Sequence, residues 1–319
     1  MKTILITGAS GTVGRAFIRN YSKKYQIISY SRNEKAQVAL KREFPMVEIL
    51  LGSVEDSNNL ENIISKYRPE IIIHAAALKH VDTAEKQPSQ AIIININGTL
   101  NILKLAQKYN VQKVVGISTD KACSADNVYG MTKYLMERIF EEYNSENMKT
   151  SCCRFGNVAW SNGSVLPFWL NRHKQGLNLP VTHVDMTRLI FTSDNAAKLI
   201  DNCVEMMDNY PEFFILSKNM KSVKMIDLAH AISKNTEVVG LRPGEKMFED
   251  LISRSELNKA YYIDDNYIVL SEYGFDKFGI SRLDEPLNSD TAEKMTENDI
   301  CDILEDVDNH LVERLKFNY

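Results

Sequence analysis

The chain has 319 residues, which predicts about two domains or one large α/β unit with an appended lobe. Its 38 Lys and Arg residues against 42 Asp and Glu residues give a formal net charge of −4, which argues against a surface for nucleic acid or an anionic membrane. A composition of 44% hydrophobic and 25% charged residues excludes global disorder.

The first half of the chain alternates short runs rich in Ile and Val with helical patterns. Such runs are typical of parallel strands that helices cover on both faces. The alternation of strand and helix predicts an α/β fold, a doubly wound parallel sheet of the Rossmann type. The predicted strands are residues 3–7, 26–31, 47–51, 70–74, 113–118 and 150–154, and the predicted helices between them are residues 14–24, 34–43, 57–66, 89–109 and 128–144.

After Arg154 the pattern changes, because Gly and Pro residues separate shorter, mixed elements. We find no internal repeat and no low-complexity linker. We therefore expect residues 1–155 to form the Rossmann-type domain, completed by segments near residues 185–215. Residues 156–319 are expected to form mostly a smaller mixed α/β lobe, interleaved with the first domain. The helices predicted in this half are residues 193–207, 224–234 and 298–315.

The first predicted strand leads directly into residues 8–14, a G-x-x-G-x-x-G spacing that opens a helix. Glycine allows the backbone to approach a pyrophosphate closely, and the helix N-terminus offers it free N–H groups. A glycine-rich turn without a ligand is the alternative, but the strand before and the helix after favour a dinucleotide site. The residues expected to contact the dinucleotide here are Gly8, Ser10, Gly11, Thr12, Val13 and Gly14.

The second predicted strand ends at Ser31 and is followed by Arg32. Sites that prefer NAD usually carry an acidic residue at this point, which holds the ribose 2′-hydroxyl. A hydroxyl and a guanidinium group suit a 2′-phosphate, so we expect NADP rather than NAD. The alternative is that Arg32 is a solvated loop residue.

Tyr129 and Lys133 are four residues apart at the start of the helix after the fifth strand, so they share a helix face. A neighbouring ammonium and a nicotinamide cation both favour the tyrosinate, so we expect the pKa of Tyr129 to lie below its usual ~10. Such a tyrosine can take a proton from a hydroxyl while a hydride leaves the same carbon. Asp120 and Lys121 closely follow the fifth predicted strand. They could form a surface ion pair, but the carboxyl end of a strand is where this fold binds its ligands.

Further motifs lie at residues 74–80, 118–121, 154–158, 163–165, 186–188 and 242–246. With the glycine-rich loop and the Tyr–Lys pair, they make nearly the whole chain resemble the extended short-chain dehydrogenases/reductases. More narrowly, the chain is similar to the UDP-N-acetylglucosamine 4,6-dehydratases of the polysaccharide biosynthesis dehydratase family. The triplet of residues 119–121 is the specific part, because epimerases of this superfamily usually carry only a Ser or Thr there.

The resemblance implies a role for each of five residues. Tyr129 is the base for the C4 hydroxyl of the sugar, Thr119 is a hydrogen-bond partner of the C4 oxygen, and Lys133 holds the cofactor ribose. Lys121 is the base at C5, and Asp120 is the acid for the departing C6 hydroxyl, before the hydride returns to C6. A lysine base requires a lowered pKa, which we expect from burial beside a cofactor cation.

The resemblance also implies a UDP-N-acetylhexosamine substrate. Arg188 and Arg242 are assigned to its diphosphate, which a planar guanidinium can clamp, and Glu245 is assigned to the uridine ribose. For His80, a place in a loop or at a subunit contact is an equal alternative. The other expected contacts are Ser53, Val54, Ala75, Ala76, Ala77, Lys79 and Asn95 for the cofactor, and Lys79, His80, Asn157, Ser164 and Val165 for the substrate.

The function predicted from the resemblance is an NADP-dependent UDP-N-acetylglucosamine 4,6-dehydratase. The alternatives are a related UDP-sugar epimerase or 5,6-dehydratase, and a dinucleotide-binding sensor without catalysis. Inversion and retention at C5 are both open, as are N-acetylglucosamine and N-acetylgalactosamine. The wider superfamily implies a homo-oligomer in which the helices of residues 89–109 and 128–144 pair across a two-fold axis.

Five cysteines with no C-x-x-C pair predict free thiols in a reducing compartment, and neither a disulfide framework nor a metal site. No stretch approaches the ~18 to 20 apolar residues that span a bilayer. The apolar run before Gly8 is too short for the core of a signal peptide. We therefore expect a cytoplasmic protein without a membrane segment.

Overall fold

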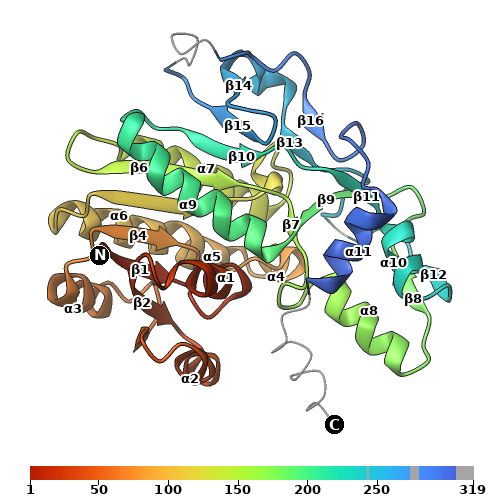
Figure 1. Cartoon of the computed structure of the whole chain (residues 1–319), viewed down its shortest axis with the longest axis horizontal. Coiled ribbons are helices and arrows are strands. Elements are labelled where there is room, and N and C mark those ends of the chain that lie inside the picture. The colour runs from red at the N-terminus through yellow and green to blue at the C-terminus, as the bar shows by residue number, and fades with distance from the viewer. Residues whose placement is uncertain (243, 274–279, 307–319) are drawn as a thin grey trace.

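The computed structural model describes residues 1–242, 244–273 and 280–306. Its main feature is a nine-stranded sheet of order β14-β15-β10-β6-β5-β4-β1-β2-β3 (Figure 1). Neighbouring strands are parallel from β3 to β10, whereas β15 and β14 are antiparallel. The order 3-2-1-4-5-6 is that of a Rossmann fold, so the predicted fold class is confirmed. The strands are β1 (Thr3–Thr7), β2 (Gln26–Ser31), β3 (Glu48–Leu51), β4 (Ile71–His74), β5 (Lys113–Ile117), β6 (Lys149–Arg154), β10 (Ile215–Lys218), β14 (Ala260–Tyr262) and β15 (Tyr267–Leu270).

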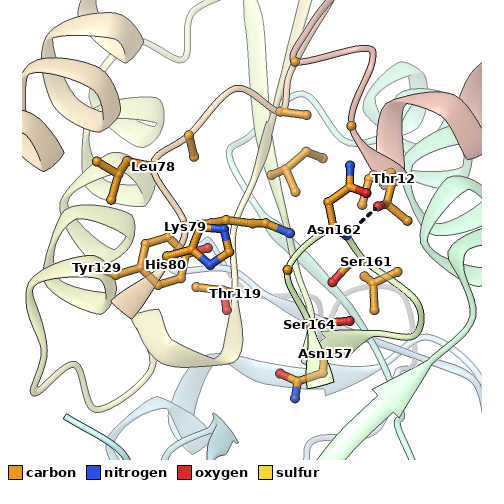
Figure 2. Close-up of a pocket in the computed structure, with 18 of the residues that line it drawn as sticks. Thr12, Leu78, Lys79, His80, Thr119, Tyr129, Asn157, Ser161, Asn162 and Ser164 are labelled. Atoms are coloured by element: carbon orange, nitrogen blue, oxygen red, sulfur yellow. Dashed lines mark hydrogen bonds between the residues drawn. The ribbon is translucent and has the colours of Figure 1, made fainter. Parts of the chain in front are cut away.

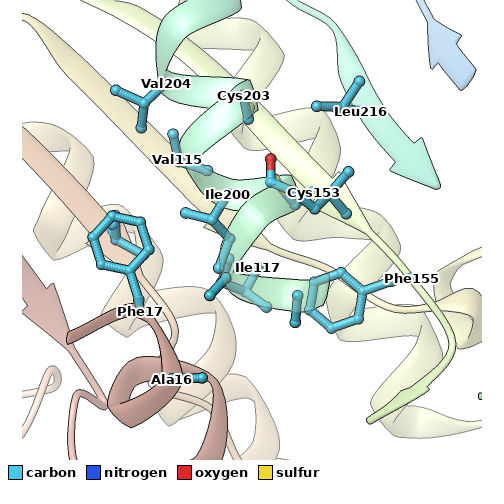
Figure 3. Close-up of a cluster of buried hydrophobic side chains, with 14 of the residues drawn as sticks. Ala16, Phe17, Val115, Ile117, Cys153, Phe155, Ile200, Cys203, Val204 and Leu216 are labelled. Carbon is cyan, nitrogen blue, oxygen red and sulfur yellow. The ribbon is translucent and has the colours of Figure 1, made fainter. Parts of the chain in front are cut away.

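Helices cover both faces of this sheet. Side chains of α1 (Thr12–Tyr21), α2 (Glu34–Glu43) and α9 (Ser193–Asn209) share one buried cluster with the strands. Those of α3 (Ser57–Tyr67), α6 (Gly98–Lys108) and α7 (Val128–Glu142) share the other. Figure 3 shows how α9 packs its apolar face onto β5 and β6. Because helices cover both faces, the central strands β1, β4 and β5 are largely apolar and buried, which is the pattern that made them recognisable in the sequence.

The predicted helix over residues 89–109 is continuous but not uniform. It comprises α5 (Pro88–Ala91), a π-helical stretch (Ile92–Asn97) and α6. The wide turn includes Asn95, whose side chain accepts a hydrogen bond from Leu78 N–H and donates to Leu78 C=O and to Thr132 Oγ1. Insertions of this kind occur often at functional sites. Apolar periodicity does not reveal them, so the prediction missed the change.

The second half contributes to both parts of the molecule. The helix α9 and the strand β10 belong to the first domain's layers, whereas β9 (Thr187–Phe191) pairs with β11 (Ser222–Lys224) and β7 (Asn157–Val158). Two small sheets pair β8 (Leu179–Val181) with β12 (Thr236–Val238) and β13 (Asp250–Ile252) with β16 (Leu287–Asn288). The remaining helices are α4 (Val81–Lys86), α8 (Val165–Lys174), α10 (Met225–Ile232) and α11 (Glu297–Glu305), with the short helical turns Asp120–Ala122 and Arg254–Lys259.

The lobe formed by α8, α10 and α11 has its own core, which includes Trp160, Trp169 and Leu228 (Figure 1). The helix α8 was not predicted, and α11 overlaps the start of the helix predicted over residues 298–315. The part of that prediction after residue 306 lies outside the described residues. Within the described ranges, none of the helices has the length and apolar character needed to cross a membrane.

Candidate active site

A cavity of about 1260 Å³ lies between the main sheet and the second lobe. Its walls include the residues that follow the C-terminal ends of the parallel strands β1 to β6, which is where ligands bind in this fold. Figure 2 shows two walls facing each other: Lys79 and Tyr129 on one side, and Ser164 and Asn162 on the other. We call this cavity the active-site pocket.

The glycine-rich loop is shaped for close approach of backbone to ligand. Gly8 has a φ of +71°, and a Cβ built there would lie 2.8 Å from the backbone nitrogen of Ala76. A Cβ on Gly14 would lie 2.6 Å from the backbone of Ala9. The N-cap residue of α1 is Gly11, which makes no side-chain cap, so N–H groups of the first turn are left for a ligand. This geometry is the cradle that a pyrophosphate requires.

Residues beside the glycine-rich loop fit the parts of a dinucleotide other than its pyrophosphate. Ser31 is buried at the end of β2 and its Oγ accepts a hydrogen bond from Ser10 N–H at 3.2 Å, while Arg32 is exposed on the pocket wall. Ser53 also lines the pocket, and its buried Oγ has no hydrogen-bond partner among the described residues. A buried hydroxyl without a partner is a group that a bound ligand would satisfy. These residues therefore fit a dinucleotide cofactor.

Most of the residues predicted from the sequence line this pocket. Two do not: Asn95 and Asp120 are buried behind the wall. Asn95 fixes the loop that contains Leu78, so it can shape the cofactor site without contacting the cofactor. The predicted residues on the wall are Gly8, Ser10, Gly11, Thr12, Val13, Gly14, Ser31, Arg32, Ser53, Val54, Ala75, Ala76, Ala77, Lys79, His80, Thr119, Lys121, Tyr129, Lys133, Asn157, Ser164, Val165, Arg188, Arg242 and Glu245.

Burial controls the proton affinities of the Tyr–Lys pair. It raises the pKa of Tyr129 to about 12, although Lys121 and a hydrogen bond with Thr119 lower it. This direction is opposite to the one expected, and the cation that acts on Tyr129 is Lys121 rather than Lys133. Burial lowers the pKa of Lys133 to about 8, and its Nζ donates to the carbonyl of Ile117 at 2.7 Å. The pair lies on one face of α7, as its spacing predicted.

Asp120 lies at the centre of a buried hydrogen-bond network. Its Oδ1 accepts from Thr119 Oγ1 at 2.8 Å, from Lys121 N–H at 2.9 Å and from Lys121 Nζ at 3.0 Å. Its Oδ2 is buried and has no partner among the described residues. Within the described part of the chain, the hydrogen-bond partners of the Asp120 carboxylate are thus its two chain neighbours, Thr119 and Lys121.

Lys121 lies between two carboxylates. Its Nζ is 3.0 Å from Asp120 Oδ1 and 3.5 Å from Glu249 Oε1, and the Glu249 side chain is only 4% exposed. Burial lowers the pKa of Lys121, but these carboxylates outweigh burial and the opposing charge of Arg188, so the pKa is raised overall. The lowering of the Lys121 pKa that we expected is thus not provided by the protein groups around it. Glu249 was not predicted from the sequence, because no residue spacing connects it to Lys121.

The two arginines assigned to the diphosphate, Arg188 and Arg242, both line the active-site pocket. The guanidinium of Arg188 is buried and donates to the carbonyls of Thr187 and Lys246 at 2.7 and 2.8 Å. It also lies 3.9 Å from Glu245 Oε1, and Glu245 accepts a hydrogen bond from the backbone N–H of Arg242 at 3.2 Å. The structure therefore brings together three residues that are separated in the chain.

The loop of residues 161–164 connects the part of the pocket expected to hold the cofactor with the part expected to hold the substrate. Asn162 N–H donates to Thr12 Oγ1 at 3.3 Å, which links residues 161–164 to the start of α1 (Figure 2). The neighbouring Gly163 has a φ of +73°, and a Cβ there would lie 2.5 Å from the ring of His80. Ser164 has a buried Oγ with no partner in the described part of the chain. Asn162 was not predicted as a site residue, because its position between Gly156 and Ser164 was all that the sequence offered to identify it.

The cysteines are free, and all but Cys301 are buried. Among the described residues, no group of three or more His, Cys, Asp or Glu side chains could hold a metal ion. The polar groups of the pocket are thus hydroxyls, amides, carboxylates and cations.

Comparison with known proteins supports this description. The profile of the family described as "Polysaccharide biosynthesis protein" matches residues 4–271. The UDP-N-acetylglucosamine 4,6-dehydratase (inverting) of Campylobacter jejuni serotype O:2 is 34% identical over 301 residues, which cover 89% of this chain and 88% of that protein. The UDP-glucose 4-epimerase of Rickettsia bellii is 34% identical over 286 residues, covering 83% of this chain and 82% of that protein.

A third relative is longer than this chain. The capsular polysaccharide biosynthesis protein CapD of Staphylococcus aureus is 35% identical over 277 residues, 81% of this chain, but the chain spans only 46% of that protein. Among solved structures, Pen from Bacillus thuringiensis superimposes with a TM-score of 0.86 at 27% identity, over 96% of this chain and 98% of Pen. The chain is therefore an enzyme of the extended short-chain dehydrogenase/reductase type and belongs to the polysaccharide biosynthesis protein family.

Proposed function

We propose that this enzyme is an NADP-dependent UDP-N-acetylglucosamine 4,6-dehydratase that forms a UDP-4-keto-6-deoxy-N-acetylhexosamine. The observation that carries the proposal is the triplet Thr119, Asp120 and Lys121 beside Tyr129, at the same pocket as the glycine-rich loop. An epimerase needs oxidation and reduction at C4, whereas a dehydratase also needs a base at C5 and an acid for the C6 oxygen. Relatives named UDP-N-acetylglucosamine 4,6-dehydratase support the same assignment.

The cofactor site is proposed to hold NADP through Ser31 and Arg32, with the pyrophosphate on the first turn of α1. When bound, NADP supplies the acceptor for the C4 hydride and returns that hydride to C6. Tyr129 would take the proton of the C4 hydroxyl as a tyrosinate, which the positive charge of a bound nicotinamide would favour against the effect of burial, and Thr119 hydrogen-bonds the C4 oxygen. Lys133, whose pKa is lowered to about 8 by burial, is placed to hold the ribose.

Elimination of water requires a neutral amine at Lys121 and a protonated Asp120. Because Lys121 Nζ lies 3.0 Å from Asp120 Oδ1, transfer of one proton from the ammonium to the carboxylate produces both groups at once. An N–H bond breaks and an O–H bond forms, and exclusion of water from the pocket by bound ligands lowers the free-energy cost of this transfer.

The neutral pair can then complete the elimination. Lys121 takes the C5 proton, the C6–O bond breaks, and the C6 hydroxyl leaves as water with one added proton. Asp120 supplies that proton through the hydroxyl of Thr119, which lies 2.8 Å from Asp120 Oδ1 and lines the pocket. The step ends with the Lys121 ammonium and the Asp120 carboxylate restored.

The substrate is proposed to bind with its diphosphate near Arg188 and Arg242 and its uridine ribose near Glu245. A homo-oligomer is also proposed, because α7 exposes Met131, Tyr134 and Leu135 at 52%, 50% and 46% of their surfaces. Apolar side chains grouped in this way mark association surfaces.

The experiment that tests the proposal uses UDP-N-acetylglucosamine and NADP in deuterated water. We expect mass spectrometry to show loss of one water with one deuterium gained, and NMR to place that deuterium at C5 and report inversion or retention. An unchanged mass with a C4 epimer would instead establish the epimerase, the alternative that the Rickettsia relative favours. No reaction with UDP- or GDP-sugars would favour the sensor.

A further inference from the structure

Glu249 is a buried carboxylate that the proposed mechanism does not use. Only 3% of the residue is exposed, and it lies directly before β13. Its backbone is held from both sides by Ser289, whose Oγ accepts from Glu249 N–H at 3.0 Å and whose N–H donates to Glu249 C=O at 2.9 Å. The carboxylate therefore has a fixed position, with Oε1 3.5 Å from Lys121 Nζ.

Charged groups reach this pair from several elements. Asp120 comes from the turn that contains Lys121, Arg188 from β9, and Tyr129 from α7. Lys246 acts on Glu249 from the preceding loop. Two carboxylates thus face the one ammonium of Lys121, and the nearest opposing cation, Arg188, hydrogen-bonds to backbone carbonyls.

We propose that Glu249 is a positioning residue for Lys121, which holds the amino group at the pocket wall and strengthens it as the base for C5. This inference rests on the proposed function. A base is stronger when its protonated form is stabilised, and a carboxylate within 4 Å stabilises an ammonium. Asp120 cannot serve this purpose throughout the reaction, because it must itself accept and release a proton. Glu249 supplies a negative charge that takes no part in that exchange.

The matched variants are Glu249→Gln, which removes the charge and keeps the shape, and Glu249→Asp, which keeps the charge. Asp250→Asn is the control, since it removes a carboxylate from the next residue, which forms neither of the Lys121 ion pairs found among the described residues. With lysine labelled by ¹³C at Cε, and the Lys121 signal assigned through Lys121→Met, we expect Glu249→Gln to lower the titration midpoint of Lys121 by about one to two pH units. Glu249→Asp and Asp250→Asn should titrate close to the wild type.

The dehydration assay gives the second readout. In Glu249→Gln we expect the falling, alkaline limb of the pH profile of kcat to move to lower pH by the same amount as the Lys121 titration, because the reactive pair of Lys121 and Asp120 holds one proton and loses it to solvent at lower pH when Lys121 is less basic. An unmoved Lys121 titration and an unmoved limb would overturn the inference and leave Glu249 a structural residue. If Glu249→Gln does not fold, Glu249→Ala is titrated instead, with bound nucleotides to stabilise it. A Lys121 titration midpoint in this variant equal to that of the wild type would also overturn the inference.

The two proposals can fail separately. Absence of dehydration by the wild type would overturn the proposed function, whereas the lysine titration is measured on the protein alone. Dehydration by the wild type together with an unmoved Lys121 titration in Glu249→Gln would overturn only the role of Glu249.

Discussion

Burial changes the proton affinity of the reactive side chains more than their chain neighbours do. The pKa of Tyr129 is raised to about 12 and that of Lys133 is lowered to about 8, in both cases chiefly because water is excluded. Lys121 is the exception, since two carboxylates outweigh its burial. The protein groups of the pocket therefore favour a protonated phenol at Tyr129 and an ammonium at Lys121 that is paired with carboxylates.

At this scale the first prediction concerns Lys121→Met. Methionine keeps the length of the side chain but cannot take the C5 proton, so we expect formation of the 4-keto-6-deoxy product to fall about 100-fold or more, while C4 oxidation continues slowly. The rates are measured by product NMR and by the absorbance of reduced cofactor. Lys259→Met is the control, because Lys259 pairs with Glu272 at 2.8 Å and does not line the pocket. Product formation at the wild-type rate would remove Lys121 from the mechanism.

The second residue-scale prediction concerns Arg32→Ala. A guanidinium that binds the 2′-phosphate contributes a charge-assisted hydrogen bond, so its loss should weaken NADP about 10-fold or more and NAD very little. Calorimetric titration of each cofactor measures both affinities. Arg42→Ala, on the exposed side of α2, is the matched control. An equal loss of affinity for NADP and NAD would contradict the assignment of the 2′-phosphate site.

At the scale of elements, α7 is fixed to the sheet by one buried network. Glu137 accepts a hydrogen bond from Ser118 Oγ at 2.6 Å, and its Oε2 lies 2.7 Å from Arg154 Nη2. The other end of α7 is equally close-packed, because a Cβ on Gly130 would lie 2.1 Å from the carbonyl oxygen of Lys121. The helix that carries Tyr129 therefore keeps a fixed distance from the turn that carries Lys121.

The element-scale prediction is that Glu137→Gln destabilises the protein strongly. It leaves the buried guanidinium of Arg154 with only one carboxylate, Glu256 at 2.9 Å, and breaking a buried ion pair of this kind costs about 3 to 5 kcal/mol. Arg138→Gln on the same helix is the control. Its ion pair with Glu141 is exposed on the arginine side, and loss of such a pair costs about 1 kcal/mol or less. Equal shifts of the urea midpoints for the two variants would contradict the role of the buried network.

At the scale of the whole molecule, the layers meet around buried polar groups as well as apolar ones. His74 ends β4, and its two ring nitrogens bond Thr7 Oγ1 of β1 at 2.8 Å and Thr99 Oγ1 of α6 at 3.1 Å. Thr99 donates to the carbonyl of Asn95, so its oxygen accepts a hydrogen bond from His74 Nε2–H. Burial accordingly lowers the pKa of His74 to about 3.

This histidine makes the stability of the fold depend on pH. The folded pKa lies below the unfolded value of about 6.5, so protons bind the unfolded state preferentially, and stability is lost as the pH falls from about 6.5 towards 3. Between pH 7.5 and pH 5 we expect His74 to reduce the free energy of unfolding by about 2 kcal/mol. Urea unfolding at both pH values measures this loss. His74→Gln should flatten the pH dependence by that amount, whereas exposed His173→Gln should leave it unchanged, and parallel curves for all three proteins would refute the prediction.

Local sequence determined the fold class, the strands and most of the helices of the first domain (α4 was not predicted), the glycine-rich loop and the shared face of Tyr129 and Lys133. These features depend on residues close together in the chain, whose spacing fixes which face is apolar and where a turn needs glycine. The similarity of motifs likewise indicated the family, which the comparisons confirm.

Only the tertiary structure decided the electrostatics of the pocket. It placed Asp120 behind the wall, brought Glu249 to Lys121, raised the pKa values of Tyr129 and Lys121, and joined Asn162 to the phosphate loop. Each of these depends on burial and on groups far apart in the chain. Proton affinity is set by the surroundings of a group in space, and the spacing of residues along the chain does not specify those surroundings.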